Sequence, residues 1–232
     1  ILSRFFWHWN IGVFFLHCDL SLFLSYNKIF FDLFFNLFVE GAEVVHQAAN
    51  VFANIISAKD KATEMQLSGE LRQQKQKALD VNKRVMIELN NQFITPIDRG
   101  DIQEVSVLLL KLTKRIVKTN TKLQIYGIDI KADDCLIGSA TTLQNITKVL
   151  VDIMQALKDG NYQRISKDEQ RTDEFDENGV EDLRRAMKEM YSGNYDTITI
   201  LKLKEIYKSI ENAIDTSVNI ADLVMQITVK DM

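Results

Sequence analysis

The sequence predicts an all-α protein: six long helices arranged as two pseudo-repeated, antiparallel three-helix bundles. From Asn27 onward, apolar residues recur at steps of three and four, which places them on one stripe of a helix. The 232 residues include a single proline, Pro96, and nine glycines, too few turn signals for an all-β chain. A hydrophobic content of 46% with 26% charged residues fits a chain that buries one sizeable core or two small ones.

The first 26 residues differ from the rest, because they are rich in aromatic and aliphatic side chains and nearly free of charge. The best apolar run, Ile11 to Tyr26, is shorter than the roughly 20 residues that a membrane span needs, and it contains His17 and Asp19. Residues 1–26 are therefore expected to be either a docking or membrane-surface helix or a segment outside the fold.

The first three-helix unit is expected over residues 27–128. An apolar stripe from Phe31 to Ile56 marks its first helix, and a more polar helix should follow from about Thr63 to Phe93. Pro96 then disfavours helix at the residue before it, and Asp98 is placed to cap the third helix, which should stop near Gly127.

The second unit is expected over residues 129–232. Its helices should run from about Ala132 to Lys158, around an acidic stretch from Asp173 to Glu181, and from a capping Asp196 to the chain's end. The fifth helix is the weakest of these predictions, because its acidic stretch contains Gly179. Asp98 and Asp196 begin similar helices about 98 residues apart, which suggests a duplicated unit.

Three stretches resemble one family. Residues 89–102 read LNNQFITPIDRGDI, which is similar to the hallmark sequence of the PhoU-like phosphate-transport regulators. The similarity is to the branch of that family long labelled a domain of unknown function, which is associated with low-affinity inorganic phosphate permeases. The stretch from Leu203 to Asp222 resembles that family's C-terminal helix, and residues 28–34 resemble its start. The resemblance covers about Asn27 to the end and implies a cytoplasmic protein of two three-helix bundles that contacts an inorganic phosphate permease.

The resemblance also implies metal clusters held by pairs of acidic residues four apart on outer helix faces, where two carboxylates can share one cation. On the last helix Glu211 and Asp215 keep such a pair, and Asp222 continues their face, opposite the apolar seam. On the fifth helix the pair is Asp176 with Val180 or Glu177 with Glu181. These residues are either a solvated helix face or a residual site for a divalent or transition metal, and no other cofactor is expected.

Where the family has an acidic run on the third helix, this chain has Lys111 and Lys114, with Lys118 one turn further on. A charged lysine cannot ligate a hard cation, so that metal site should be lost. In the simplest interpretation, the three lysines form the solvent-exposed side of the helix. Alternatives are that Lys111 and Lys114 replace the positive charge of the metal, or that the lysines form an anion-binding stripe. Lys111, Lys114, Lys118 and Asp222 are the residues expected to contact a partner.

The function predicted from these observations is non-enzymatic regulation of phosphate transport through contact with a permease. Alternatives are a membrane-associated helical scaffold, with peripheral membrane contact, and a metal-binding helical bundle; a homodimer is a further option. A formal net charge of -4 argues against a nucleic-acid partner. Cys18 and Cys135 lie far apart, as expected of reduced cytosolic thiols.

Overall fold

A computed structural model describes residues 32–127 and 134–230, and this part of the chain consists of helices and the turns between them. A first helix occupies residues 32–56 and is followed by α2 (Lys61–Asn91), α3 (Arg99–Tyr126), α4 (Asp134–Lys158), α5 (Tyr162–Met190) and α6 (Thr197–Lys230). The all-α prediction with six helices is confirmed. Residues 1–26, and the alternatives considered for them, lie outside the described residues.

Helix boundaries follow the local capping chemistry. The Asp98 carboxylate accepts hydrogen bonds from the N–H groups of Gly100 (2.7 Å) and Asp101 (3.3 Å), and Asp196 does the same for Ile198 (2.9 Å) and Thr199 (3.1 Å). Both predicted caps are therefore confirmed. Each satisfies amide donors that have no partner inside the helix.

One predicted boundary was wrong. Helix α2 ends at Asn91 rather than Phe93, and the extended Gln92, whose carbonyl accepts from the Arg99 guanidinium (2.8 Å), follows it. The predicted start of the fourth helix, about Ala132, lies outside the described residues, and α4 is described from Asp134. Helix α5 begins at Tyr162 and contains the acidic stretch around which it was expected.

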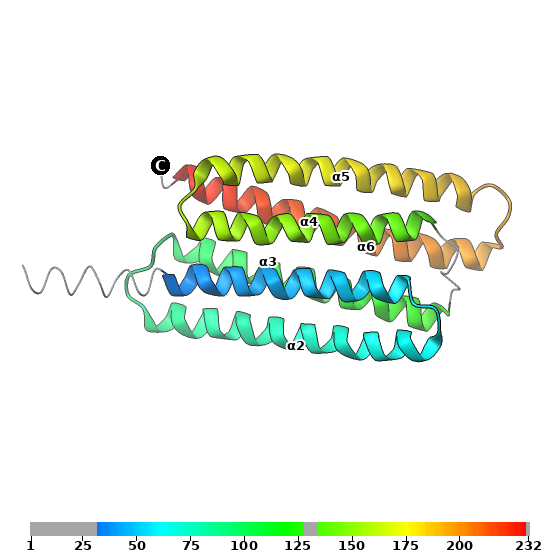
Figure 1. Ribbon diagram of the computed structural model, residues 1–232, viewed down its shortest axis with the longest axis horizontal. Helices are drawn as coiled ribbons and strands as arrows, with labels where there is room; N and C mark the ends of the chain where they lie inside the picture. Colours follow the sequence, from blue (N-terminus) through cyan, green and yellow to red (C-terminus); the bar gives the residue numbers. More distant parts are fainter. Residues whose placement is uncertain (1–31, 128–133, 231–232) are drawn as a thin grey trace, which may run out of the picture.

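The two units lie side by side as layers of antiparallel helices (Figure 1). The first helix and α4 lie in front in this view, α3 and α6 lie behind them, and α2 and α5 form the two outer edges. Most of the buried apolar residues form one cluster that crosses from one unit to the other, and Val44, Ala78 and Leu110 form a small second one. The main cluster includes Phe38, Phe52, Ile116, Ile153 and Ile206, each 1% exposed or less. The predicted boundary at residues 128–129 falls outside the described residues, so the division into two domains stays a prediction.

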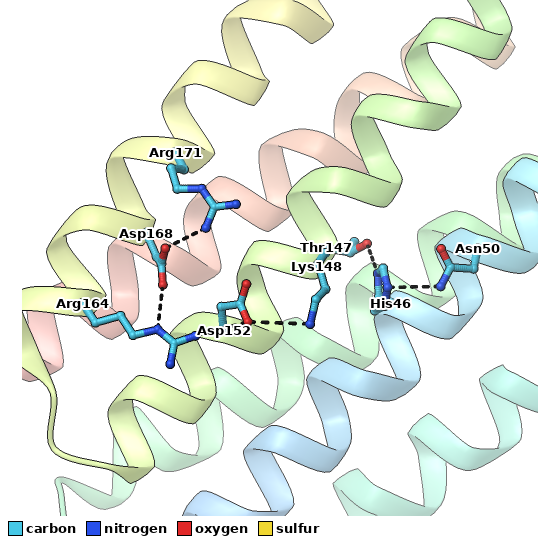
Figure 2. Close-up of polar contacts among 8 residues, drawn as sticks. All are labelled: His46, Asn50, Thr147, Lys148, Asp152, Arg164, Asp168 and Arg171. Atoms are coloured by element: carbon cyan, nitrogen blue, oxygen red, sulfur yellow. Dashed lines mark hydrogen bonds and ion pairs between the residues drawn. The ribbon is translucent and has the colours of Figure 1, made fainter.

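A polar seam joins the first helix to α4 (Figure 2). The His46 ring lies between Thr147 Oγ1 (3.2 Å from Nδ1) and Asn50 Nδ2 (3.1 Å from Nε2), and Asn50 in turn accepts from Gln144 (3.1 Å). Burial, and then the positive charge of Lys148, lowers the pKa of His46. The lowered pKa favours the neutral ring, whose hydrogen bonds link the first helix to α4.

The first half of α5 is fixed against the bundle by Asp168, which is 4% exposed. Its carboxylate is paired with Arg171 (2.8 Å) and Arg164 (3.4 Å), and Arg164 also reaches Asp152 of α4 (3.3 Å), as Figure 2 shows. The buried Ile165 and Thr172 lie on the same side of the helix. These contacts hold the first half of α5 against the bundle despite the acidic middle of the helix.

Candidate functional site: a charged face on helices α3, α5 and α6

The acidic residues predicted on the last helix all lie on α6. Glu211, Asp215 and Asp222 are half-buried along the side of α6 that borders α5. Helix periodicity places them opposite the buried apolar residues of α6, and α5 packs closely enough to cover part of each. A Cβ atom added to Gly179 of α5 would lie only 2.9 Å from Ile214 Cδ1. That close approach brings the carboxylates of the two helices together.

Helix α5 contributes four more acids to this border. They are Glu169, Asp173, Asp176 and Glu177. Together with Glu211, Asp215 and Asp222 they are called the acidic groove below, a name for these seven residues and not for a cavity. Burial, and then repulsion from Asp215 and Asp173, raises the pKa of Asp176. Burial, followed by the Asp173 charge, likewise raises the pKa values of Glu169 and Asp222. Like charges are thus crowded here without full compensation.

Two cations relieve part of this repulsion. Lys208 Nζ lies 2.7 Å from a carboxylate oxygen of Glu211. Arg115 of α3 donates to Thr216 Oγ1 (2.6 Å) and to the carbonyl of Asn212, and its charge lowers the pKa of Asp215. Burial and Glu211 still raise the pKa of Asp215 overall.

The predicted lysines form a separate row on α3. Lys111, Lys114 and Lys118 are exposed, and none makes an ion pair with any residue in the described ranges. Lys118 lies close enough to Glu205 of α6 to help lower the pKa of that acid, after the larger effect of Lys122. Lys111, Lys114 and Lys118 are called the lysine row below. The contacts therefore give no support to the idea that Lys111 and Lys114 replace a metal's charge beside the acids.

The lysine row and the acidic groove share one face of the molecule. Helices α3 and α6 are linked by the Arg115–Thr216 hydrogen bond and by the Lys122–Glu205 ion pair (2.8 Å). Both helices lie behind the first helix and α4 in Figure 1, so their exposed sides point away from that layer. The structure thus brings together the residues predicted to contact a partner.

Sequence reasoning assigned neither Glu169 nor Asp173 to a site: Glu169 lies before the stretch in which the fifth helix was expected, and Asp173 was taken only as part of that stretch. The signal was present, since Glu169, Asp173 and Asp176 are spaced by four and three residues and share one helix side. Among the described residues, no group of three or more His, Cys, Asp or Glu side chains has an arrangement that could hold a metal ion. Whether Glu211 and Asp215 bind a cation stays a prediction.

No protein-family model matches this chain. A relative from Bacillus subtilis (strain 168), the UPF0111 protein YkaA, is 23% identical over 201 residues, which is 86% of this chain and 97% of the relative. A PhoU-like protein from Shewanella oneidensis MR-1 superposes with a TM-score of 0.77 at 10% identity, over 84% of this chain and 99% of that one. The fold is PhoU-like.

A second PhoU-like protein of Shewanella oneidensis MR-1, which is named for phosphate regulation, gives a TM-score of 0.69 at 10% identity. It matches 85% of this chain and 99% of its own. Among the described residues, no helix is both long and apolar enough to cross a membrane. The family resemblance inferred from residues 89–102 and 203–222 is thus supported by the PhoU-like fold.

Proposed function

We propose that this protein is a non-enzymatic, cytoplasmic regulator of inorganic phosphate transport that acts by contact with a phosphate permease. The observation that supports the proposal most directly is the PhoU-like fold, shared with a Shewanella oneidensis MR-1 protein named for phosphate regulation. The permease as partner rests on the similarity of residues 89–102 to the branch of that family associated with such permeases.

The charge of the shared face fits such a partner. Cytoplasmic loops of membrane proteins carry an excess of lysine and arginine, so the inner side of a permease offers positive charge. The acidic groove offers carboxylates whose mutual repulsion would be relieved by those cations. The lysine row, beside it, would contact acidic groups of the same partner.

Exposed charge pairs steer association and set its salt dependence more than they set its final affinity. Contact through this face should therefore weaken as ionic strength rises and the Debye length shrinks from about 10 Å at 0.1 M to about 3 Å at 1 M. The proposal requires accessible helical surface rather than an enclosed reaction site, and the lysine row and the acidic groove provide that surface.

The test is recovery of the permease with a tagged protein from detergent-solubilised membranes at low and high ionic strength, combined with phosphate uptake in a deletion strain. Reversing charge in the groove with Asp173→Lys and Asp176→Lys should reduce recovery at least tenfold at low salt. A matched control reverses two exposed acids outside the groove, Glu43→Lys and Glu174→Lys.

Unchanged uptake in the deletion strain, together with no permease recovered at low salt, would contradict the proposal. Equal loss of recovery in the groove variant and the control would show that overall charge, and not the acidic groove, governs the contact.

A further inference from the structure

The polar seam between the first helix and α4 is a chain of hydrogen bonds whose direction is set at its Thr147 end (Figure 2). The Thr147 hydroxyl shares its single hydrogen between the carbonyls of Leu143 (2.8 Å) and Gln144 (2.9 Å). Thr147 Oγ1 therefore accepts from the His46 ring, and Nδ1 is the ring nitrogen that carries the proton. The backbone of Gln144 also favours a proton on the ring.

The other ring nitrogen, Nε2, is an acceptor. Asn50 Nδ2 lies 3.1 Å from it, and the Asn50 carbonyl oxygen is already occupied, because the Gln144 amide donates to it at 3.1 Å. Asn50 thus presents N–H groups to the ring. A second proton, on Nε2, would face a donor, and both Asn50 and Gln144 would have to turn round to receive it. The seam as it stands matches the neutral ring.

The surroundings of the ring also oppose a positive charge. Burial lowers the pKa of His46 most, and the charge of Lys148 lowers it further. Asp152 acts in the opposite direction, but its carboxylate is shared by Lys148 (3.6 Å) and Arg164 of α5 (3.3 Å). A protonated ring would therefore lie beside a lysine with only part of one carboxylate to compensate it.

A second set of polar contacts joins the two units on the other side of the bundle, between α3 and α6 (Figure 1). Three cations make these contacts: Arg115 with Thr216, Lys122 with Glu205, and Lys202 with the carbonyl of Tyr126. Arginine and lysine keep their charge between pH 5 and pH 8, whereas histidine ordinarily changes its charge in this range. His46 is the only histidine among the described residues, so mild acid should act on the front seam and spare the contacts behind it.

From this geometry we infer that the polar seam is a pH-sensitive latch between the two units. Uptake of a second proton by the His46 ring breaks the hydrogen bond from Asn50, turns the ring toward solvent and loosens the first helix from α4, while α3 and α6 stay joined. The folded state binds this proton less tightly than the unfolded chain does. The contact therefore weakens as pH falls below the ordinary histidine pKa of about 6.5. The inference concerns the protein alone and does not depend on the permease contact.

The experiment is amide hydrogen exchange of the full chain at pH 5 and pH 7, with each rate corrected for intrinsic exchange at that pH. In the wild type, local opening of the first helix and α4 should increase by about fivefold or more at pH 5, whereas opening of α3 and α6 should change by less than about twofold. His46→Gln places a neutral side chain in the seam at both pH values and should abolish the increase.

Asn50→Asp is the sharper variant, because a carboxylate at this position accepts from a protonated ring and from Gln144 alike. NMR follows the titration of His46 through the ring signal that His46→Gln removes. Its midpoint should lie below about 6.5 in the wild type and above about 6.5 in Asn50→Asp. The exchange response should change sign as well, with the first helix and α4 of this variant better protected at pH 6 than at pH 8.

Asn194→Asp is the matched control, because it makes the same substitution at an exposed position in the turn between α5 and α6, and it should respond like the wild type. Circular dichroism checks that each variant is folded. The inference is overturned by a wild-type midpoint at or above about 6.5. It is equally overturned by acid-induced opening that persists in His46→Gln, or by an Asn50→Asp protein that opens in acid as the wild type does.

Discussion

Helices α3 and α6 occupy matching places in the two units, but their exposed sides differ in charge. Each begins at a capping aspartate, Asp98 or Asp196, and each buries one apolar side in the common core. The exposed side of α3 carries lysines, whereas the border of α6 carries carboxylates. The buried positions must stay apolar for both units to fold, whereas solvent-exposed positions can carry charge of either sign.

The largest expected effect comes from placing a charge in the apolar interior of the first unit. Leu109 is 4% exposed and packs beside Gly41 of the first helix, so Leu109→Asp buries a carboxylate without a partner. We expect the free energy of unfolding to fall by about 4 kcal/mol or more. Val107→Asp, two residues away on the exposed side, is the control and should cost less than about 0.5 kcal/mol.

Thermal unfolding followed by circular dichroism measures this difference. Because one apolar core joins both units, we expect the whole structure to melt in a single, lowered transition. A melt at the wild-type temperature would contradict the fold, and two separated transitions would show that the units are independent.

A smaller effect is expected where α3 meets α6. Arg115→Ala removes the hydrogen bonds to Thr216 and to the carbonyl of Asn212, which should cost about 1–3 kcal/mol in urea unfolding. Lys118→Ala, one turn away and without an ion pair to a described residue, should change stability by less than about 0.5 kcal/mol. Equal effects would mean that Arg115 lies in solvent like the lysine row.

Neutralising two carboxylates of the acidic groove should raise the melting temperature by an amount that depends on pH. Burial and neighbouring carboxylates raise the pKa of Asp176. The pKa of Asp215 is raised as well, despite the nearby charges of Lys208 and Arg115. The folded state therefore holds these protons more tightly than the unfolded state. Its stability falls as pH rises from the ordinary aspartate pKa through the raised one.

Asp176→Asn with Asp215→Asn should accordingly raise the melting temperature by about 1–3 °C at pH 7, and the gain should shrink near pH 4. Melting curves measured from pH 4 to pH 8 check the direction. Lys111→Gln with Lys114→Gln is the matched comparison and should leave the curve unchanged, since these cations lack close partners. A lower melting temperature of the acidic variant at pH 7 would show that its carboxylates stabilise the fold.

The smallest expected effect concerns the amount of metal bound to the purified protein. Protein purified without chelators should carry well under one equivalent of iron, manganese or zinc, because Glu211 is already in an ion pair with Lys208 and two ligands rarely hold a metal alone. Elemental analysis is the measurement. One equivalent or more, lost in the Glu211→Ala, Asp215→Ala variant, would show that the groove is a metal site.

Much of the helical framework could be predicted from the sequence. The caps at Asp98 and Asp196 and the stop at Gly127 were found because they depend on side chains close in sequence to the amides they serve. The start of α5 was not predicted, although Asn161 caps it by accepting a hydrogen bond from the Arg164 N–H (3.1 Å), and contacts of Asp168 and Arg164 with each other and with Asp152 of α4 then hold its first half in place. The resulting neighbourhood of Glu169 and Asp222 was therefore missed as well.

The sequence by itself determined that this chain forms amphipathic helices, where most of them end, and which residues carry charge outside the core. Those properties follow from the periodicity of apolar residues and from local capping. Only the tertiary structure decided that α3 lies beside α6, that α5 covers the border of α6, and that lysines and acids share one face. Helix periodicity fixes the direction in which each side chain points from the axis of its helix. Which other helix lies on that side is decided by packing across the whole core.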